Sequence, residues 1–286
     1  MNDFNTLIEA KKWFLQQSNS FDDLLFNRLI RDLFDLSDVD FLLKQHDFLT
    51  DLEKEKIKSA TTKLLTGKPL QYVIGFSRFY GRKFIVNPNV LIPRVETEEL
   101  IDWILSDYKN DNKPLSILDL GTGSGVIAIT LSLEFPESKV IGSDISDKAL
   151  SVARLNALRL NKNVELINSN LFENIKNQKF DLIVSNPPYI SKDEIDLMDS
   201  SVLNYEPHDA LFASENGLLF YKKILPELDS FLSDHGKAYF EFGFRQKNKI
   251  KQLCNKFCGN KFMFEFKKDV SNNDRMLKIK RNLNNK

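Results

Sequence analysis

The sequence between residues 116 and 130 is SILDLGTGSGVIAIT, which has the order of a strand, a loop and a helix. The apolar run Ser116–Leu120 is typical of a buried strand, and Val126–Phe135 is typical of a helix. Between them lies the glycine loop Gly121–Gly125, where the backbone must turn sharply and a ligand can approach closer than a Cβ atom would allow. This order predicts a parallel sheet covered by helices.

Short apolar runs alternate with amphipathic stretches from Leu115 toward the end of the chain. Strands are predicted at Ser116–Leu120, Lys139–Ser143, Glu165–Asn168, Phe180–Ser185, Lys237–Phe242, Phe262–Lys267 and Arg275–Ile279. Helices are predicted between them, notably at Val126–Phe135, Lys148–Asn161 and Leu218–Leu232. We therefore expect an α/β domain, and we place it at residues 95–286.

The first third of the chain has a different pattern. Between Phe4 and Leu65 apolar residues recur at steps of three and four, which predicts a small helical bundle over residues 1–66. Gly67-Lys68-Pro69 ends the bundle. Residues 67–94 then predict a hairpin linker, because glycines and a proline separate short apolar runs. These runs are Tyr72–Ile74, Phe79-Tyr80 and Lys83–Val86.

Composition excludes several classes of protein. Hydrophobic residues make up 42% of the 286 and charged residues 28%, which is the balance of a globular protein with a substantial core. Lys+Arg and Asp+Glu both number 40, so no overall positive field favours a nucleic-acid partner. The start of the chain lacks the pattern of a signal peptide, and no apolar run is long enough to span a bilayer. We therefore expect a cytoplasmic protein with no membrane partner.

The cysteines and histidines predict no metal site. Cys254 and Cys258 have the spacing of one helical turn, which is typical of reduced thiols near a core. His46, His208 and His235 lie in unrelated contexts without a second ligand at metal-binding spacing.

Asp144 ends the strand that follows the glycine loop, about 20 residues further along the chain. A carboxylate at this point can accept hydrogen bonds from both hydroxyls of a ribose. The alternative is that Asp144 caps the next helix, a role that Asp147 could equally fill. The glycine loop and Asp144 together predict adenosine recognition. They leave open whether the cofactor is a nicotinamide dinucleotide or S-adenosylmethionine.

Asn186-Pro187-Pro188-Tyr189 follows the predicted strand Phe180–Ser185. In a parallel sheet this segment lies at the same edge as the glycine loop, so the two should share one crevice. An amide or arylamine nitrogen is a poor nucleophile because its lone pair is delocalised. The Asn186 side-chain oxygen and the Pro187 carbonyl can accept its two N–H groups, while Tyr189 offers a flat wall. The segment thus predicts methyl transfer to a planar nitrogen.

The glycine loop, Asp144 and Asn186–Tyr189 together resemble the class I S-adenosylmethionine-dependent methyltransferases that modify exocyclic or amide nitrogens. Further segments resemble the peptide chain release factor glutamine methyltransferases of the HemK/PrmC type. These segments are Gly67–Gly75, Phe79–Gly81, Val90–Glu98, Tyr205–Pro207, Ala210-Leu211, Glu241–Gly243 and Asp274-Arg275. The resemblance covers nearly the whole chain.

This resemblance implies a Rossmann-like sheet of seven strands, mostly parallel with an antiparallel last strand, and an N-terminal bundle that docks the release factor. It implies a monomer that uses S-adenosylmethionine, releases S-adenosylhomocysteine and forms N5-methylglutamine in a Gly-Gly-Gln motif. The implied catalytic residues are Asn186, Pro187 and Tyr189. The implied substrate contacts are these three with Pro188, Phe79, Arg94 and Glu96. The implied cofactor contacts are Gly121, Thr122, Gly123, Ser124, Gly125, Asp144, Ile145, Asn170, Leu171, Phe172 and Asn186.

Three departures from the family pattern stand out. Val95 replaces the usual proline, Asn170 a common aspartate and Ala213-Ser214 a pair of glycines. Two other substrates stay open: a ribosomal protein glutamine, and an exocyclic amino group of a nucleic acid, which would require a flipped base. Glu96-Thr97-Glu98 after Pro93-Arg94 resembles the release factor branch more closely than the ribosomal protein branch. A non-enzymatic adenosine-binding regulator would not need Asn186–Tyr189.

Overall fold

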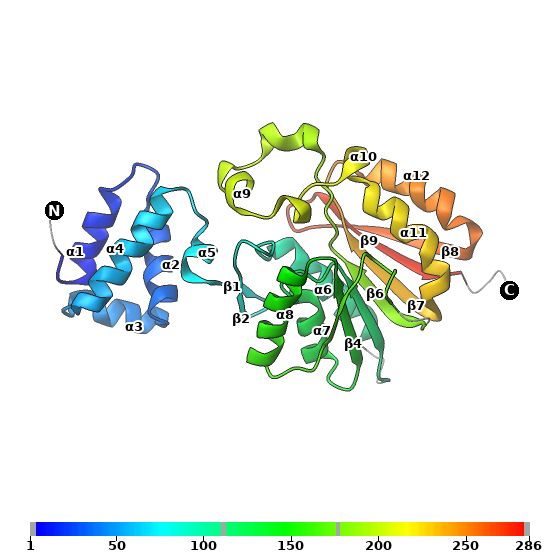
Figure 1. Cartoon of the computed structure of the whole chain (residues 1–286), viewed down its shortest axis with the longest axis horizontal. Coiled ribbons are helices and arrows are strands. Elements are labelled where there is room, and N and C mark those ends of the chain that lie inside the picture. Colours follow the sequence, from blue (N-terminus) through cyan, green and yellow to red (C-terminus); the bar gives the residue numbers. More distant parts are fainter. Residues whose placement is uncertain (1–3, 110–112, 176–177, 283–286) are drawn as a thin grey trace. The chain divides into compact units, whose positions relative to one another are not determined.

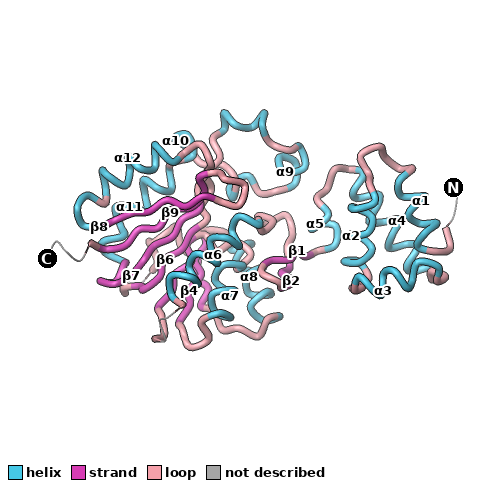
Figure 2. The backbone as a smooth tube through the Cα atoms, turned by 180° about the vertical axis from the view of Figure 1, so that it is seen from behind, coloured by secondary structure: helices cyan, strands magenta, loops and turns pink. Residues whose placement is uncertain are grey.

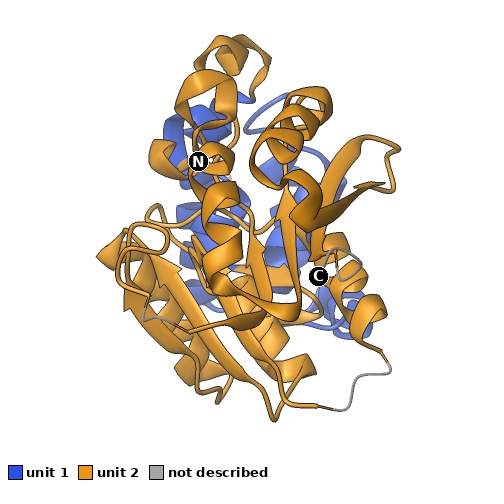
Figure 3. Cartoon of the chain, turned by 90° about the vertical axis from the view of Figure 1, so that its right-hand side faces the viewer, with its two compact units in different colours: residues 1–76, 199–205 blue, residues 77–198, 206–286 orange. Residues whose placement is uncertain are grey.

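The computed structural model describes residues 4–109, 113–175 and 178–282 (Figure 1). The chain forms two compact units, which Figure 3 colours separately. The helical unit comprises residues 1–76 and 199–205, and the sheet unit comprises residues 77–198 and 206–286. In the described part of the chain, no helix combines the length and apolar character needed to cross a bilayer.

The helical unit confirms the predicted N-terminal bundle. Its elements are α1 (Leu7–Leu15), α2 (Asp23–Leu33), α3 (Asp38–Leu43), η1 (Lys44–His46), α4 (Asp51–Leu65), α5 (Leu70–Ile74) and α9 (Ser200–Tyr205). Helices α1 to α4 each begin after a side chain that accepts a backbone N–H, from Thr6, Asp22, Ser37 and Thr50. Phenylalanines fill the centre, with Phe14 and Phe26 at most 1% exposed.

The run Tyr72–Ile74, predicted as part of the hairpin linker, instead lies in helix α5. The Tyr72 N–H donates to the Pro69 carbonyl, and Gly75 ends the helix with a φ of 84°. Packing explains the difference, because Leu70 and its neighbours on α5 lie against the core of the helical unit. The hairpin itself is confined to β1 (Phe76–Phe79) and β2 (Arg82–Ile85), joined by Tyr80-Gly81.

The sheet unit has one sheet of seven strands in the order β5-β4-β3-β6-β7-β9-β8. The strands are β3 (Ser116–Leu120), β4 (Lys139–Asp144), β5 (Glu165–Asn168), β6 (Phe180–Ser185), β7 (Leu232–Glu241), β8 (Phe262–Lys268) and β9 (Asp274–Arg281). Strand β9 is antiparallel to both of its neighbours, and the pairs from β5 to β7 are parallel. The predicted seven-stranded α/β fold is confirmed. Strand β7 begins five residues before the predicted start at Lys237, because Leu232 already pairs with Phe180 ahead of a register shift.

Helices cover both faces of this sheet (Figures 1 and 2). On one face α6 (Val95–Tyr108), α7 (Val126–Glu134) and α8 (Asp147–Arg159) pack on side chains such as Ile117. On the other face α11 (Leu219–Phe231) and α12 (Lys247–Phe257) pack on side chains such as Leu118. Neighbouring residues of a strand thus enter opposite cores, which explains the continuous apolar runs in the sequence. The remaining short helices are η2 (Lys192–Leu197), η3 (His208–Ala210), α10 (Ser214–Gly217) and η4 (Gly259–Lys261).

Candidate active site

The candidate site lies where the strand order of the sheet reverses. Strand β3 lies between β4 and β6, so the chain runs from β3 outward to β5 and later returns to β6 on the other side. Ligands of open α/β sheets bind outside the carboxyl ends of the strands at such a point. The glycine loop follows β3 and Asn186 follows β6, and the Ser185 hydroxyl joins these strand ends by donating to the Leu120 carbonyl at 2.7 Å.

Each glycine of the loop has a left-handed backbone, with φ of 73° at Gly121, 56° at Gly123 and 82° at Gly125. A Cβ atom at Gly121 or Gly123 would meet nothing within 4 Å, so the backbone there is open to a ligand. A Cβ atom at Gly125 would lie 3.2 Å from that of Ala153, so this glycine allows α7 and α8 to pack closely. The other two residues of the loop, Thr122 and Ser124, are buried.

Asp144 is held in place by two backbone amides. Its carboxylate accepts from Gly123 N and Ser146 N, both at 2.9 Å. Burial raises the pKa of this carboxyl, and these two hydrogen bonds act in the opposite direction. Ser146, whose hydroxyl accepts from the backbone of α8, is the cap of that helix, so neither Asp144 nor Asp147 fills that role. Ile145, next to Asp144, is 68% exposed and offers apolar surface at this edge.

Asp119 lies in β3, just before the glycine loop, and was not among the predicted site residues. One of its carboxylate oxygens accepts from the Thr122 hydroxyl at 2.6 Å and from Ala128 N at 3.1 Å. The other oxygen, Oδ1, is buried without a hydrogen-bond partner among the described residues. Burial raises the pKa of Asp119 to about 7. A carboxylate inside an apolar strand run was the signal available in the sequence.

The turn after β5 carries the remaining predicted cofactor residues. Asn170 Nδ2 donates to the Glu173 carboxylate at 2.6 Å, so the side-chain oxygen of Asn170 is the atom left to accept from a ligand. Leu171 has a φ of 53°, an uncommon value for a side chain of this size. Phe172 is 7% exposed and stacks on Phe231 at 4.3 Å, so it belongs to the core.

Side chains that are distant in sequence hold the Asn186–Tyr189 segment. Asn186 Nδ2 donates to the Thr97 hydroxyl at 3.0 Å, and the Tyr189 hydroxyl donates to the Glu241 carboxylate at 3.1 Å. The Tyr189 carbonyl accepts from Gln246 Nε2 at 2.7 Å. Pro187 is buried and Pro188 is half-buried.

The loop that contains α10 fits closely against the same segment. A Cβ atom at Gly217 would lie 2.0 Å from the Tyr189 carbonyl oxygen, so only glycine fits there. Sequence reasoning missed Thr97, Gly217, Glu241 and Gln246. The available signal was again a carboxylate, Glu241, in an apolar run.

Not every predicted substrate contact lies at this edge. Arg94 pairs with the buried Glu206 at 2.6 Å, and Glu206 also accepts from Ile92 N at 3.0 Å. Glu96 lies close enough for its charge to raise the pKa of Glu241. Phe79 is 1% exposed and packs edge-on against Phe84 in the core, so the structure does not bring it together with the others.

The local structure accommodates two of the departures from the family pattern without strain. Val95 is the first residue of α6 and is 68% exposed. Ala213 has an extended backbone, with φ of −129° and ψ of 142°, and requires no glycine. The left-handed backbone falls on the next residues, Glu215, Asn216 and Gly217.

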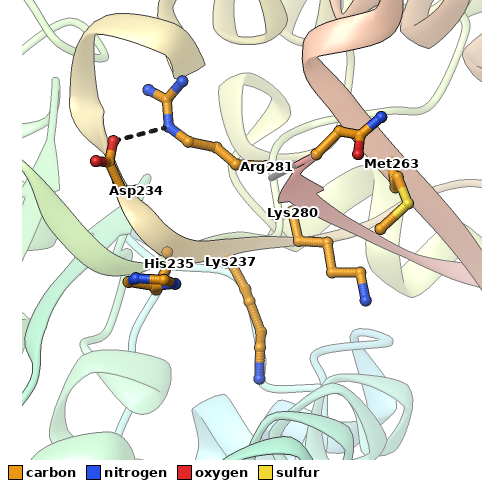
Figure 4. A pocket seen from close by; sticks show the side chains of 8 residues that line it. Asp234, His235, Lys237, Met263, Lys280 and Arg281 are labelled. Carbon is orange, nitrogen blue, oxygen red and sulfur yellow. Dashed lines mark ion pairs between the residues drawn. The ribbon is translucent and has the colours of Figure 1, made fainter. Parts of the chain in front are cut away.

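A hollow at the amino end of β7 contains none of the candidate site residues described above (Figure 4). It is lined by Asp234, His235, Gly236, Lys237, Met263, Lys280, Arg281 and Asn282, and Arg281 lies 4.0 Å from Asp234 there. Because the hollow lies at the amino end of β7, it is separate from the edge that carries the glycine loop. Within residues 4–109, 113–175 and 178–282, no His, Cys, Asp and Glu side chains gather in threes to hold a metal ion.

Known proteins match both parts of the chain. A family model described as PrmC N-terminal domain matches residues 7–75, and one described as Methyltransferase small domain matches residues 102–206. A methyltransferase from Pyrococcus furiosus shares the fold with a TM-score of 0.52 at 20% identity, over 76% of this chain and 95% of its own.

Curated relatives are more similar still. A release factor glutamine methyltransferase of Enterococcus faecalis is 42% identical over 236 residues, which are 82% of this chain and 84% of that protein. A release factor glutamine methyltransferase of Staphylococcus aureus is 36% identical over 269 residues, which are 93% of this chain and 95% of that protein. The chain therefore belongs to the release factor glutamine methyltransferase family.

Proposed function

We propose that this protein transfers a methyl group from S-adenosylmethionine to the side-chain amide nitrogen of the glutamine in the Gly-Gly-Gln motif of peptide chain release factors. The observation that carries this proposal is the position of Asn186 and Pro187. They lie at the carboxyl end of β6, beside the strand that ends in the glycine loop. We propose that the enzyme acts as a monomer in the cytoplasm.

The residues around the glycine loop fit S-adenosylmethionine. Gly121 and Gly123 leave the backbone open, and the anchored carboxylate of Asp144 suits the two ribose hydroxyls. Asn170 would accept from the adenine amino group through its side-chain oxygen. The unpartnered oxygen of Asp119 suits an ammonium group, because a buried carboxylate oxygen is costly unless a donor reaches it. We assign these five residues to the cofactor.

S-adenosylmethionine supplies an electrophilic methyl group on a sulfonium, so the protein need not supply an acid. In this proposal the chain orients the glutamine amide. Asn186 Oδ1 and the Pro187 carbonyl accept its two N–H groups, which favours loss of delocalisation as the nitrogen attacks. Tyr189 forms a wall beside the planar amide. Burial and the Glu241 charge raise the pKa of Tyr189, so its hydroxyl stays protonated and is no base. The proton lost from nitrogen passes to solvent.

The helical unit offers a surface for the protein substrate. Five large apolar side chains within residues 39–52 are at least 61% exposed. This apolar patch consists of Val39, Leu42, Leu43, Phe48 and Leu52. These residues are close together in the sequence, and exposed apolar surface is typical of protein-binding sites. We propose that the patch docks the release factor, which offsets the entropy lost when the flexible Gly-Gly-Gln loop is ordered.

The test is incubation with labelled S-adenosylmethionine and a panel of intact release factors, followed by mass mapping of the modified residue. The expected result is one methyl group on the glutamine of Gly-Gly-Gln. A ribosomal protein and single-stranded and double-stranded DNA serve as rival substrates in the same assay. Preferential labelling of either rival would contradict the substrate assignment.

A further inference from the structure

Asn186 is the first member of a chain of hydrogen bonds. Its Nδ2 donates to the Thr97 hydroxyl at 3.0 Å, and that hydroxyl donates to Glu241 Oε2 at 2.7 Å. The three residues come from the end of β6, the first turn of α6 and the end of β7. Thr97 is 3% exposed and Glu241 is 1% exposed, so water does not compete at the acidic end.

The order of donors in this chain follows from proton counting. A threonine hydroxyl has one proton, and the Thr97 hydroxyl donates it to Glu241 Oε2. Thr97 therefore presents only lone pairs to Asn186. Of the two ends of an amide only the nitrogen can donate, so Nδ2 must face Thr97 and Oδ1 must face the other way.

The groups around Glu241 favour its role as an acceptor. The Tyr189 hydroxyl donates to its second oxygen at 3.1 Å, and the Tyr221 hydroxyl donates to its backbone carbonyl at 2.6 Å. Burial raises the pKa of the Glu241 carboxyl, while the Thr97 hydrogen bond and the charge of Arg275 act in the opposite direction. The nearby negative charge of Glu96 raises the pKa of Glu241, in the same direction as burial. A donor thus reaches each carboxylate oxygen.

We propose that Thr97 and Glu241 are positioning residues that hold the Asn186 side chain with its oxygen toward the nitrogen to be methylated. This inference rests on the proposed function, in which Asn186 accepts an N–H of the substrate amide. Without these hydrogen bonds, the two orientations of the Asn186 amide would be close in energy. In the reversed orientation its NH₂ group would face the NH₂ group of the substrate, and two donors would oppose each other.

The test compares Thr97→Val with Thr97→Ser. Valine keeps the shape of threonine and removes both hydrogen bonds, whereas serine keeps the hydroxyl. We expect Thr97→Val to lower kcat about 10–100-fold, the usual effect of removing a group that orients a reacting side chain. The dissociation constant of S-adenosylmethionine should stay within about threefold of the wild-type value, because the Thr97 hydroxyl bonds to Asn186 and Glu241 and not to the glycine loop. Thr97→Ser should recover most of the lost kcat.

Thr130→Val is the matched control. Thr130 is fully buried in α7, and its hydroxyl has no hydrogen-bond partner among the described residues. The Thr130→Val variant should keep the wild-type kcat. Thermal melts of all three variants show whether each one folds. Wild-type kcat in Thr97→Val, or equal losses in Thr97→Val and Thr97→Ser, would overturn the inference. Failure of the proposed function would instead show in the wild-type protein, which would leave release factors unmodified.

Discussion

The two compact units differ in which side chains they expose and which they bury. In the helical unit, Leu43 is 72% exposed and Phe48 is 85% exposed. In the sheet unit, three carboxylates are at most 4% exposed, namely Asp119, Glu206 and Glu241. The helical unit therefore carries five exposed apolar side chains within residues 39–52, and the sheet unit carries deeply buried carboxylates.

Each arrangement is costly unless something compensates for it. A buried carboxylate needs donors, and Glu206 and Glu241 have them in Arg94, Thr97 and Tyr189. Exposed apolar side chains lose the benefit of burial unless a partner covers them. From this difference we infer that the sheet unit holds reacting groups in place and that the helical unit binds a protein surface. Variants in each unit can break or sharpen this division.

The largest effect is expected for Asn186→Ala. Losing one preorganised hydrogen-bonding group typically costs roughly 10²–10³-fold in turnover. Affinity for S-adenosylmethionine should stay within several-fold, because Asn186 acts mainly on the amide in the transition state. Single-turnover methylation and cofactor titration separate the two quantities. Asn27→Ala in α2 of the helical unit is the matched control, and a wild-type rate in Asn186→Ala would refute the acceptor mechanism.

A smaller loss is expected for Gly217→Ala, compared with Gly67→Ala as its match. Both glycines have left-handed backbones, with φ of 79° and 80°, so this backbone strain alone should cost each variant roughly 1–2 kcal/mol of stability, and the clash at Gly217 adds to that cost. A Cβ atom at Gly67 meets nothing within 4 Å, whereas one at Gly217 displaces the Tyr189 carbonyl. Only Gly217→Ala should therefore lower kcat, by about 10–100-fold, since small misplacements of reacting groups are costly. Equal kcat values for the two variants would show that the segment tolerates displacement.

The sequence predicted the sheet and singled out the glycine loop and Asn186–Tyr189 because these signals are local. An apolar run, a glycine loop and a pair of prolines can be recognised within a few residues of each other. The residues that hold Asn186 and Tyr189 could not be found in this way. Thr97 lies 89 positions from Asn186 and 144 from Glu241, so only the folded sheet brings them together.

The run Tyr72–Ile74 shows that tertiary packing can also override a local sequence signal. Its aromatic and β-branched residues favour a strand, but a run of three is short. Leu70, Val73 and Ile74 gain more by packing as a helix against the core of the helical unit. The hairpin therefore starts only at Phe76.

The apolar patch of the helical unit is tested by the double variant Leu43→Ser and Phe48→Ser. We expect KM for an intact release factor to rise about tenfold, which corresponds to about 1.4 kcal/mol of binding energy. The kcat for the factor, and kcat/KM for a short Gly-Gly-Gln peptide, should not change, since a short peptide lacks the release factor surface that the patch would bind. Leu158→Ser is the control in the sheet unit, where Leu158 is 78% exposed on α8. Equal losses of kcat/KM for the release factor and the peptide would contradict a docking role of the patch.

The smallest expected effect is a gain of stability in the sheet unit from Val95→Pro. Proline is favoured at the first position of a helix, because its fixed φ matches the helix and the missing N–H has no partner within the helix. Arg94, with φ of −103° and ψ of 148°, already has the extended backbone that a following proline requires. The substitution should add about 0.4–1 kcal/mol by restricting the unfolded chain. Val95→Ala, which leaves φ unrestricted, is the control, and denaturant melts of both variants measure the difference. Since Val95 is 68% exposed, its side chain contributes little packing, so a loss of stability would mean that the start of α6 is more constrained than these dihedral angles indicate.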